Sequence, residues 1–337
     1  MNYIIKQIKK TELPECTEVI RRSFETVACE FGLSIDNCPT NPAFITSNIL
    51  ILDYEKGNMM YGLYADDRIA GFMKLVRTNS DCYELGRLSV LPEYRHKGYG
   101  RALIEYAKDI VIKNSGVKIK IGIIDKNTVL KNWYIKNGFV QTELREFPHL
   151  PFIVCFMEME ITLKDRMMLV FPTLTHKDAA MDYKNEYFIN GENIIHGDGG
   201  LDCTATYEEW LVKITNDLDK NKITANRVPS TTYFAVIDDR IVGTIQIRHE
   251  LNAFLLSYGG HIGYGIRPTE RRKGYATKML SLALEKSKAL GLKRVLVSCD
   301  KANIGSAKTI INNGGILENE VTEENGNVYQ RYWIDLE

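Results

Sequence analysis

The 337-residue sequence lacks any apolar run long enough to cross a bilayer, for which about 20 consecutive apolar residues are needed. The N-terminal stretch MNYIIKQIKKTEL also has no long apolar core of the signal-peptide kind. Charge of neither sign is in excess, because 43 lysines and arginines face 43 aspartates and glutamates. These absences argue against a membrane span and against nucleic acid or an anionic membrane as partner. They predict a cytoplasmic protein whose partner is a small molecule or a local site.

The seven cysteines are scattered, with no CxxC pair and no cysteine and histidine cluster of zinc-ligand spacing. The count is odd, so the disulfide framework of a secreted protein is not indicated. We therefore expect reduced thiols and no metal site. Two common nucleotide-binding motifs are missing as well, because there is no GxxxxGK[ST] and no GxGxxG after a strand.

What the sequence does contain is an internal repeat. EYRHKGYGRALIEYAK (93–108) and ERRKGYATKMLSLALE (270–285) both place Arg-x-x-Gly-x-(Gly or Ala) before an amphipathic run. At an offset of 176 residues the matching pairs are Pro92 and Pro268, Arg95 and Arg271, Lys97 and Lys273, Gly98 and Gly274, Tyr99 and Tyr275, Asn127 and Asn303, and Gly138 and Gly314. Upstream, DDRIAG (66–71) and DDRIVG (238–243) match four residues off this offset, which indicates a short insertion. The length suits two domains of about 170 residues, and we expect them at 1–163 and 168–337.

Each half predicts an α/β (α+β) domain with a mixed, mostly antiparallel sheet flanked by helices. Apolar residues at helical spacing mark one helix that stops at Gly32 and a second at about 43–56. The segments that predict strands or helices after these are MMYGLYADDRIAGFMKLV (a hairpin turning at Asp66-Asp67), CYELGRLSVLP, the helix after the glycine turn, VKIKIGII, NTVLKNWYIKNG and PFIVCFMEME. The second half repeats this order.

The glycine turn between a strand and a helix predicts an anion-binding site. Such a turn points backbone N–H groups and the positive end of the helix dipole at one spot. Gly98 and Gly100 have no Cβ and permit positive φ, and Arg95 and Lys97 add charge. The alternative is an ordinary strand-to-helix turn whose glycines serve only packing.

LSVLPEYRHKGYGRALI followed by NTVLKNWYIKNGF resembles the GCN5-related N-acetyltransferase (GNAT) superfamily. GGHIGYGIRPTERRKGYATKML with NIGSAKTIINNGG is similar to a group of predicted bacterial acetyltransferases of that superfamily. The resemblance implies that each turn holds the pyrophosphate of acetyl-CoA, the acyl donor, and that its pantetheine arm adds like a strand between CYELGRLSVL and VKIKIGII. It also implies that each sheet splays where the strand ending near Leu91 or Arg267 meets the one starting near Val117 or Lys293. The contacts it implies are Leu88, Val90, Arg95, His96, Lys97, Gly98, Tyr99, Gly100, Arg101 and Asn127 in the first half, and Ile266, Arg271, Arg272, Lys273, Gly274, Tyr275, Ala276, Thr277, Asn303 and Ser306 in the second.

Acyl transfer from a thioester to an amine requires donors for the oxyanion and an acid for the departing thiolate. The resemblance implies that backbone N–H groups near 88–90 and 264–266 receive the oxyanion, and that Tyr134 protonates the thiolate. Tyr134 lies seven residues after Asn127, so both are expected on one helix face. A half-buried tyrosine that serves only packing is the alternative.

The candidate base is Glu84, on the strand before the loop, although a surface or hairpin-paired carboxylate fits the sequence equally well. In the second half the counterpart of Tyr134 is Ile310, which cannot donate a proton. Tyr264 or Tyr275 would then have to substitute as the acid.

We therefore predict an acetyl-CoA-dependent N-acetyltransferase that transfers acetyl to an amine of a small molecule or peptide by direct attack on the thioester. The alternative is an acetyl-CoA-binding sensor or regulatory protein in which one or both domains are non-catalytic. A third possibility is that one copy is only scaffold. The acceptor is expected at the first helices and their loops, within 36–44 and 185–202.

Overall fold

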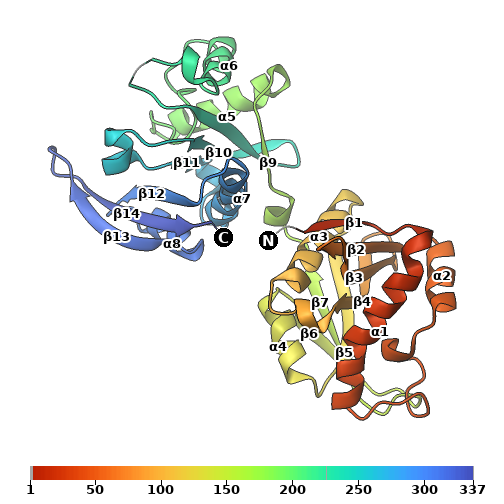
Figure 1. The fold of residues 1–337 in the computed structure, drawn as a ribbon. Coiled ribbons are helices and arrows are strands. Elements are labelled where there is room, and N and C mark those ends of the chain that lie inside the picture. Colours follow the sequence, from red (N-terminus) through yellow and green to blue (C-terminus); the bar gives the residue numbers. More distant parts are fainter. Residues whose placement is uncertain (1–2, 225, 337) are drawn as a thin grey trace. The chain divides into compact units, whose positions relative to one another are not determined.

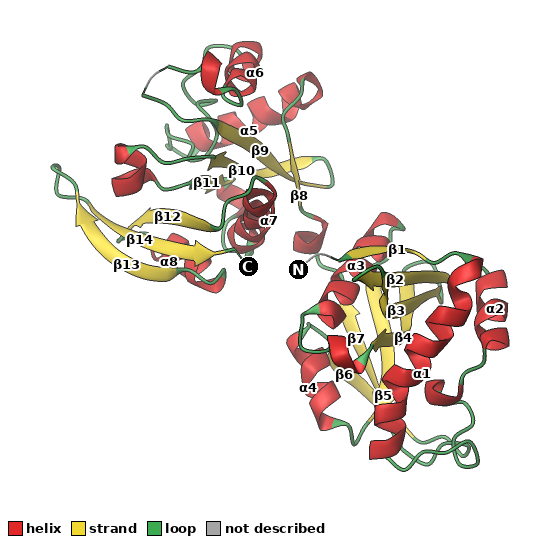
Figure 2. Ribbon diagram, viewed as in Figure 1, coloured by secondary structure: helices red, strands yellow, loops and turns green. Residues whose placement is uncertain are grey.

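The chain divides into two compact units, residues 1–162 and 163–337, in the computed structural model (Figure 1). The structure describes residues 3–224 and 226–336. Each unit has its own buried core, and each is an α/β domain with helices against its sheet strands (Figure 2). Within the described residues no helix is long and apolar enough to span a membrane.

Unit 1 is built on one seven-stranded sheet. Its strands, in sheet order, are β1 (Ile4–Gln7), β2 (Met59–Ala65), β3 (Arg68–Arg77), β4 (Cys82–Val90), β5 (Lys118–Ile124), β7 (Val154–Glu160) and β6 (Val140–Arg145). Its helices are α1 (Leu13–Glu30), α2 (Ser47–Glu55), α3 (Tyr99–Lys113) and α4 (Thr128–Lys136). All neighbouring strands are antiparallel except β4 and β5, which run parallel. This mixed sheet is the one expected from the sequence.

The sheet of unit 1 splays open between β4 and β5. The two strands pair only where residues 82–84 face 118–120. Beyond these pairs β4 continues to Val90 and β5 to Ile124 without a shared ladder among the described residues. The opening therefore lies at the carboxyl end of β4, immediately before the glycine turn, as the family resemblance implies.

A β-bulge shapes β4 inside this opening. Between the pairs Phe72–Ser89 and Lys74–Gly86, β4 has one residue more than β3, and Arg87 adopts a left-handed φ of 52°. A bulge bends its strand and redirects backbone groups, and a left-handed non-glycine residue is strained. The distortion falls on the strand that is expected to hold the oxyanion donors.

Unit 2 divides its strands into two antiparallel sheets. One sheet has the order β11 (Ile262–Ile266), β10 (Arg240–Arg248), β9 (Ser230–Ile237), β8 (Met168–Val170), and the other has the order β12 (Arg294–Asp300), β14 (Val328–Asp335), β13 (Ile316–Thr322). The helices are α5 (Lys177–Ile189), α6 (Tyr207–Asn216), α7 (Tyr275–Ala289) and α8 (Ile304–Asn312). Where unit 1 has one splayed sheet, the strands of unit 2 form two separate sheets. The single mixed sheet expected for this half is therefore not formed.

The reason for the separation lies just before β11. A π-helical turn, Leu255–Gly259, occupies the segment that would begin the strand, so β11 starts only at Ile262. The junction to β12 is reduced to His261, whose N–H donates to the Leu296 carbonyl (2.7 Å) and whose Nδ1 accepts from the Leu296 N–H (2.9 Å). An imidazole thus replaces a ladder carbonyl.

The hairpin turns predicted at the two Asp-Asp pairs are confirmed. Asp66 and Asp67 have φ of 52° and 60°, and Asp238 and Asp239 have φ of 45° and 66°. Two left-handed residues in a two-residue loop match the right-handed twist of the flanking strands.

Candidate functional sites

The two glycine turns have the same backbone conformation. Gly98 (φ 75°, ψ −2°) and Gly274 (φ 79°, ψ 6°) are left-handed, and so are His96 (φ 62°) and Arg272 (φ 66°), two residues before each glycine. A Cβ on either glycine would meet no atom within 4 Å. Glycine is therefore favoured here by the dihedral angle and not by crowding.

These turns present unpaired backbone donors at a helix start. Within the described residues the N–H groups of 96–101 and of 272–277 donate to no acceptor. The donors open α3 and α7, where the helix dipole is positive. We call each such set of six N–H groups a cradle. Its geometry suits an anion with several oxygens.

Gly100 does not have the conformation expected from the sequence. It lies inside α3 without a positive φ, and a Cβ there would sit 3.1 Å from Cζ2 of Trp133. The expectation of backbone freedom at Gly100 is therefore wrong, because the residue makes room for a ring. In unit 2 the matching positions hold Ala276 and Thr309, a larger residue than glycine and a smaller one than tryptophan.

The motif arginines fasten the end of the strand to the first helical segment of each unit. Arg95 donates from Nε to the Val90 carbonyl (3.3 Å) and from Nη2 to the Ser23 carbonyl (2.8 Å) and Thr26 Oγ1 (3.0 Å). These three bonds of Arg95 go to protein atoms, so its expected contribution to binding an anion is limited to its charge.

Arg271 repeats this arrangement in unit 2. Its Nε donates to the Ile266 carbonyl (3.1 Å), and its two Nη atoms bind the Glu192 carboxylate at 2.7 Å each. The Glu192 bonds raise the pKa of Arg271 well above its usual range. Glu192 is therefore engaged by the motif itself.

The side chains of Tyr99 and Tyr275 are only 6% exposed and pack in the two cores. These two residues can reach a ligand only through their backbone N–H groups. The exposed side chains around the cradles are instead His96, Lys97, Arg101, Arg272 and Lys273. All but His96 are lysines or arginines, although Lys273 also pairs with Glu270 (2.7 Å).

Asn127 and Asn303 cap the helices that follow the open strands. Asn127 Oδ1 accepts from the Leu130 N–H and Asn303 Oδ1 from the Ser306 N–H, both at 3.0 Å. An asparagine at this position is a strong N-cap signal, which the sequence carried in both copies. Capping accounts for the repetition of these asparagines, and only their amide N–H groups remain for a ligand.

Tyr134 lies on α4 and is only 6% exposed, with its ring 4.9 Å from that of Trp133 and 5.2 Å from that of Phe139. Its hydroxyl bonds no atom of the described residues. Burial raises the pKa of Tyr134 well above its usual range, so the phenol keeps its proton at neutral pH. A neutral donor without a protein partner is what an acid for a leaving thiolate requires.

Glu84 lies apart from these groups. It faces Lys120 in the short parallel ladder, at the closed end of the splay, and its side chain is exposed. Three residues separate it from Leu88 along β4. The geometry brings Leu88, Val90 and the cradle to the open end but leaves Glu84 at the other.

In unit 2 a hydroxyl reaches the corresponding region from the strand. Tyr264 on β11 and Ser306 on α8 share a hydrogen bond of 2.8 Å, at the positions that Leu88 and Leu130 hold in unit 1. Burial raises the pKa of Tyr264 to about 12, whereas Ile310 is fully buried. Of the two substitute acids considered from the sequence, Tyr275 points into the core and Tyr264 faces α8.

A charged triad beside the β4 bulge was not evident from the sequence. The Asp53 carboxylate on α2 accepts from Lys74 Nζ (3.1 Å) and from Arg87 Nη1, and all three side chains are less than 20% exposed. Burial alone would raise the pKa of Asp53, but the bonds and charges of Lys74 and Arg87 hold it below its usual value. The triad anchors α2 to the strained bulge, and its members are too far apart in sequence to form a local motif.

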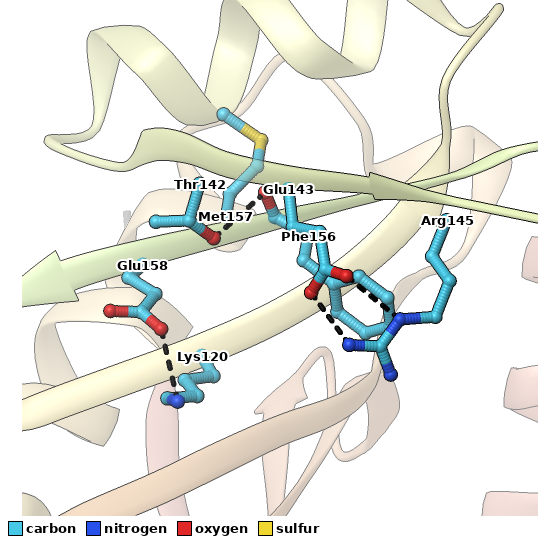
Figure 3. Close-up of a pocket in the computed structure, with 7 residues that line it drawn as sticks. All are labelled: Lys120, Thr142, Glu143, Arg145, Phe156, Met157 and Glu158. Atoms are coloured by element: carbon cyan, nitrogen blue, oxygen red, sulfur yellow. Dashed lines mark hydrogen bonds and ion pairs between the residues drawn. The ribbon is translucent and has the colours of Figure 1, made fainter.

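A shallow pocket lies elsewhere on unit 1, on β5, β6 and β7 (Figure 3). Its charges are satisfied internally, since Lys120 pairs with Glu158 (3.0 Å) and Arg145 binds both oxygens of Glu143 (2.9 and 2.7 Å). No residue of the cradle lines it. The pocket is therefore a weak candidate compared with the open strands.

Comparison with known proteins gives one family twice. Residues 56–141 match the family described as "Acetyltransferase (GNAT) domain", and residues 201–310 match "Acetyltransferase (GNAT) family". The two matches cover both cradles' strands and together span more than half of the chain.

Several relatives are similar over parts of the chain. An uncharacterized N-acetyltransferase, YlbP, of Bacillus subtilis is 37% identical over 68 residues, 17% of this chain and 42% of that protein. A spermidine N(1)-acetyltransferase of Thermoplasma acidophilum is 33% identical over 81 residues, 24% of this chain and 50% of that protein. The chain thus spans half or less of these two relatives' length. Among solved structures, the PaiA N-acetyltransferase of Thermoplasma acidophilum in complex with coenzyme A aligns with 23% identity and a TM-score of 0.41 over 48% of this chain and all of that one.

Proposed function

The chain belongs to the GNAT acetyltransferase superfamily and carries two of its domains in tandem, and from this we propose that it is an acetyl-CoA-dependent N-acetyltransferase acting on an amine of a small molecule or peptide. The observation that carries the proposal is the cradle, present twice with one backbone conformation and unpaired N–H donors. The similarity of part of the chain to a spermidine acetyltransferase supports an amine as acceptor.

In each unit the cradle would hold the pyrophosphate of acetyl-CoA. The N–H groups of 96–101 or 272–277 would donate to its oxygens, and Lys97, Arg101, Arg272 and Lys273 would add positive charge. The pantetheine arm would follow the unpaired edge of β4 or β11. Backbone N–H groups of 88–90 and 264–266 are the proposed oxyanion donors.

The reaction is a direct transfer. The neutral amine nitrogen attacks the thioester carbonyl, the C–N bond forms, the C–S bond breaks, and the thiolate takes a proton while the amine loses one. In unit 1 Tyr134 is the proposed acid, because it is neutral and its hydroxyl has no partner among the described residues. Glu84 remains a proposed base only through water, because it lies at the closed end of the splay.

Two functions are considered for the second unit, binding of acetyl-CoA alone and catalysis, and they differ in whether a side chain supplies the acid. Ile310 has no proton to give, which favours a domain that binds acetyl-CoA without turnover. The Tyr264 hydroxyl, held by Ser306, favours a domain in which the acid comes from β11. We propose the catalytic role, since the Tyr264 hydroxyl faces α8, which is the counterpart in unit 2 of the Tyr134-bearing helix α4.

The test is release of free coenzyme A thiol from acetyl-CoA across a panel of primary amines. An enzyme releases thiol in proportion to an acetylated amine detected by mass spectrometry. A sensor binds acetyl-CoA but releases no thiol with any amine. That second result would replace the enzyme by the regulatory alternative.

A further inference from the structure

Arg248, at the end of β10, is a part-buried cation without a counter-charge among the described residues. Its Nη1 donates to the carbonyls of Gly259 (2.9 Å) and Gly260 (3.0 Å), while its Nε and Nη2 donate to no atom of the described residues. No carboxylate within the described part of the chain pairs with it. Burial accordingly lowers its pKa, with no nearby acid to oppose the effect.

Other arginines of the same unit are paired with acids. Arg267 binds Asp182 and Glu186, Arg271 binds Glu192, and Arg331 binds Glu318, all within 2.9 Å. Removing a guanidinium from water without a partner charge is costly, so such a group is commonly completed by a ligand. The unpaired edge of Arg248, Nε with Nη2, is the edge that binds a carboxylate through two parallel bonds.

The guanidinium lies over the strand that is expected to hold the acetyl group. A Cβ on Gly263 of β11 would stand 3.5 Å from Nη2 and 3.8 Å from Cα of Gly197, so the missing side chain leaves the guanidinium directly above the strand. Gly263 immediately precedes Tyr264, the first of the proposed oxyanion donors. An anion at Arg248 would therefore be close to the reacting carbonyl.

The neighbouring groups leave this charge unanswered. His261 is buried beside Arg248 and burial lowers its pKa to about 4, so it is neutral at pH 7 and supplies no negative charge. The Trp333 ring, 6.2 Å from that of His261, has a buried Nε1 without an acceptor in the described residues. The region therefore holds donors in excess of acceptors.

We propose that Arg248 binds a carboxylate of the amine acceptor, so that unit 2 acetylates amines that also carry a carboxylate. The proposal rests on the proposed function, which makes β11 part of an acyl-transfer site. Unit 1 has Val76 at the matching strand position and the Asp53, Lys74 and Arg87 triad nearby, so its acceptor would differ.

The first experiment measures binding alone. Amino acids and their decarboxylated counterparts, such as lysine with cadaverine and phenylalanine with phenethylamine, are titrated into the full chain carrying Gly98→Glu, with acetyl-CoA replaced by coenzyme A. We expect the carboxylated member of at least one pair to bind about 10-fold or more tightly than its counterpart, equivalent to about 1.4 kcal/mol. Equal or absent binding of both members in every pair would overturn the proposal.

The variants locate the effect at Arg248. Arg248→Gln should abolish the preference, but it also removes the bonds to Gly259 and Gly260. Gly263→Asp keeps those bonds and places a carboxylate beside Nη2, whereas Gly263→Asn adds the same bulk without charge. We expect the preference to be lost with Asp and kept with Asn, and equal behaviour of these two would refute the assignment.

Thiol release with the same pairs separates this inference from the proposed function. If carboxylated amines bind preferentially but no thiol is released, the Arg248 site stands and the enzymatic function fails. If thiol is released equally from both members of each pair, the function stands and the Arg248 site fails.

Discussion

The two units keep the same cradle but place their hydroxyl groups on different elements. Unit 1 has a tyrosine on α4 and a leucine on β4, and at the matching positions unit 2 has an isoleucine on α8 and a tyrosine on β11. Backbone donors depend on the chain conformation, whereas a side-chain donor needs only to reach a point in space. A duplicated fold can therefore move its acid from helix to strand without changing how it holds an anion.

The acceptor sides differ more than the cradles do. Unit 1 has a bulged β4 with a strained Arg87 neutralised by Asp53, while unit 2 has a regular β11 with glycines where unit 1 has Arg87 and Ser89. Arg248 and the Gly197 backbone take the space left at Gly263, and the His196 backbone and the Tyr187 hydroxyl take the space left at Gly265. On the proposals made above, this difference would give the two units acceptors of different charge for one acyl donor.

The largest effect is expected from closing one cradle at a time. Gly98→Glu or Gly274→Glu puts a carboxylate at the anion site and forces a left-handed φ on a residue with a Cβ, which costs about 1–2 kcal/mol in backbone strain. Calorimetric titration should find two acetyl-CoA sites in the wild type and one in each variant. Gly98→Ala, which adds the strain without the charge, is the control. A single site in the wild type would make one of the turns a packing turn.

The relocated hydroxyl is tested by Tyr134→Phe and Tyr264→Phe, each with the other unit's cradle closed by the Glu substitution. Both changes keep a ring and remove the donor, so kcat should fall by about 10²- to 10⁴-fold in each case, while the acetyl-CoA dissociation constant barely changes. Circular dichroism on the same samples controls for folding. Full turnover of the Tyr264→Phe protein would show that Tyr264 is not the acid of unit 2. Absence of turnover from unit 2 before this change would return unit 2 to a binding role.

A smaller effect separates the units by pH. His261 has a pKa lowered to about 4, first by burial and then by the Arg248 charge, against an unfolded value of about 6.5. Between these values the unfolded chain binds a proton that the folded unit does not, so the free energy of unfolding of unit 2 falls as the pH drops, by up to about 3 kcal/mol.

Hydrogen exchange resolved by peptide from pH 7 to 4.5, with unit 1 as internal reference, measures this loss. His261→Asn keeps an acceptor for the Leu296 N–H and does not titrate, so its loss should be smaller. Asp198 acts in the opposite sense, because burial raises its pKa to about 6 and its contribution is lost as the pH rises from about 4 to 6. Both proteins share Asp198, so identical profiles would count against the role of His261.

The smallest effect concerns side-chain size at two matching pairs, Gly100 with Trp133 in unit 1 and Ala276 with Thr309 in unit 2. Gly100→Ala brings a methyl group to 3.1 Å from the Trp133 ring, and the same change should be tolerated once Trp133→Thr has removed that ring. A double-mutant cycle of urea unfolding should give a coupling of about 1 kcal/mol. Additivity within error would show that the ring yields freely.

The splay before the turn was expected from the family resemblance. Local patterns predicted the repeat, the Asp-Asp hairpins and the left-handed Gly98. Each of these depends on a few adjacent residues whose conformational preferences are strong. The exposed edge strands β6 and β13 were not predicted, because all six residues of VQTELR are exposed and nothing alternates between apolar and polar. Their pairing is a property of the neighbouring strand β7 or β14.

The site was predictable only as far as it is backbone. The cradle follows from the glycine turn, but the hydrogen bonds of Asp53 with Lys74 and Arg87 join residues 21 and 34 positions apart. Arg248 and His261 gained their roles from the π-helical turn that shortens β11. The capping roles of Asn127 and Asn303 could have been inferred, since asparagine before a helix is a local signal.

The arginine that begins each motif joins two segments of its unit, the end of the strand before the turn and the first helical segment. On the proposed function, different substrates would touch these two segments. Arg95 holds the end of β4 to α1, and Arg271 holds the end of β11 to Glu192 beyond α5. Acetyl-CoA bound at the turn and an amine bound at the first helical segment would therefore both act on the contact that this arginine makes. By thermodynamic reciprocity, if bound acetyl-CoA changes the affinity for the amine by some factor, the bound amine changes the affinity for acetyl-CoA by the same factor.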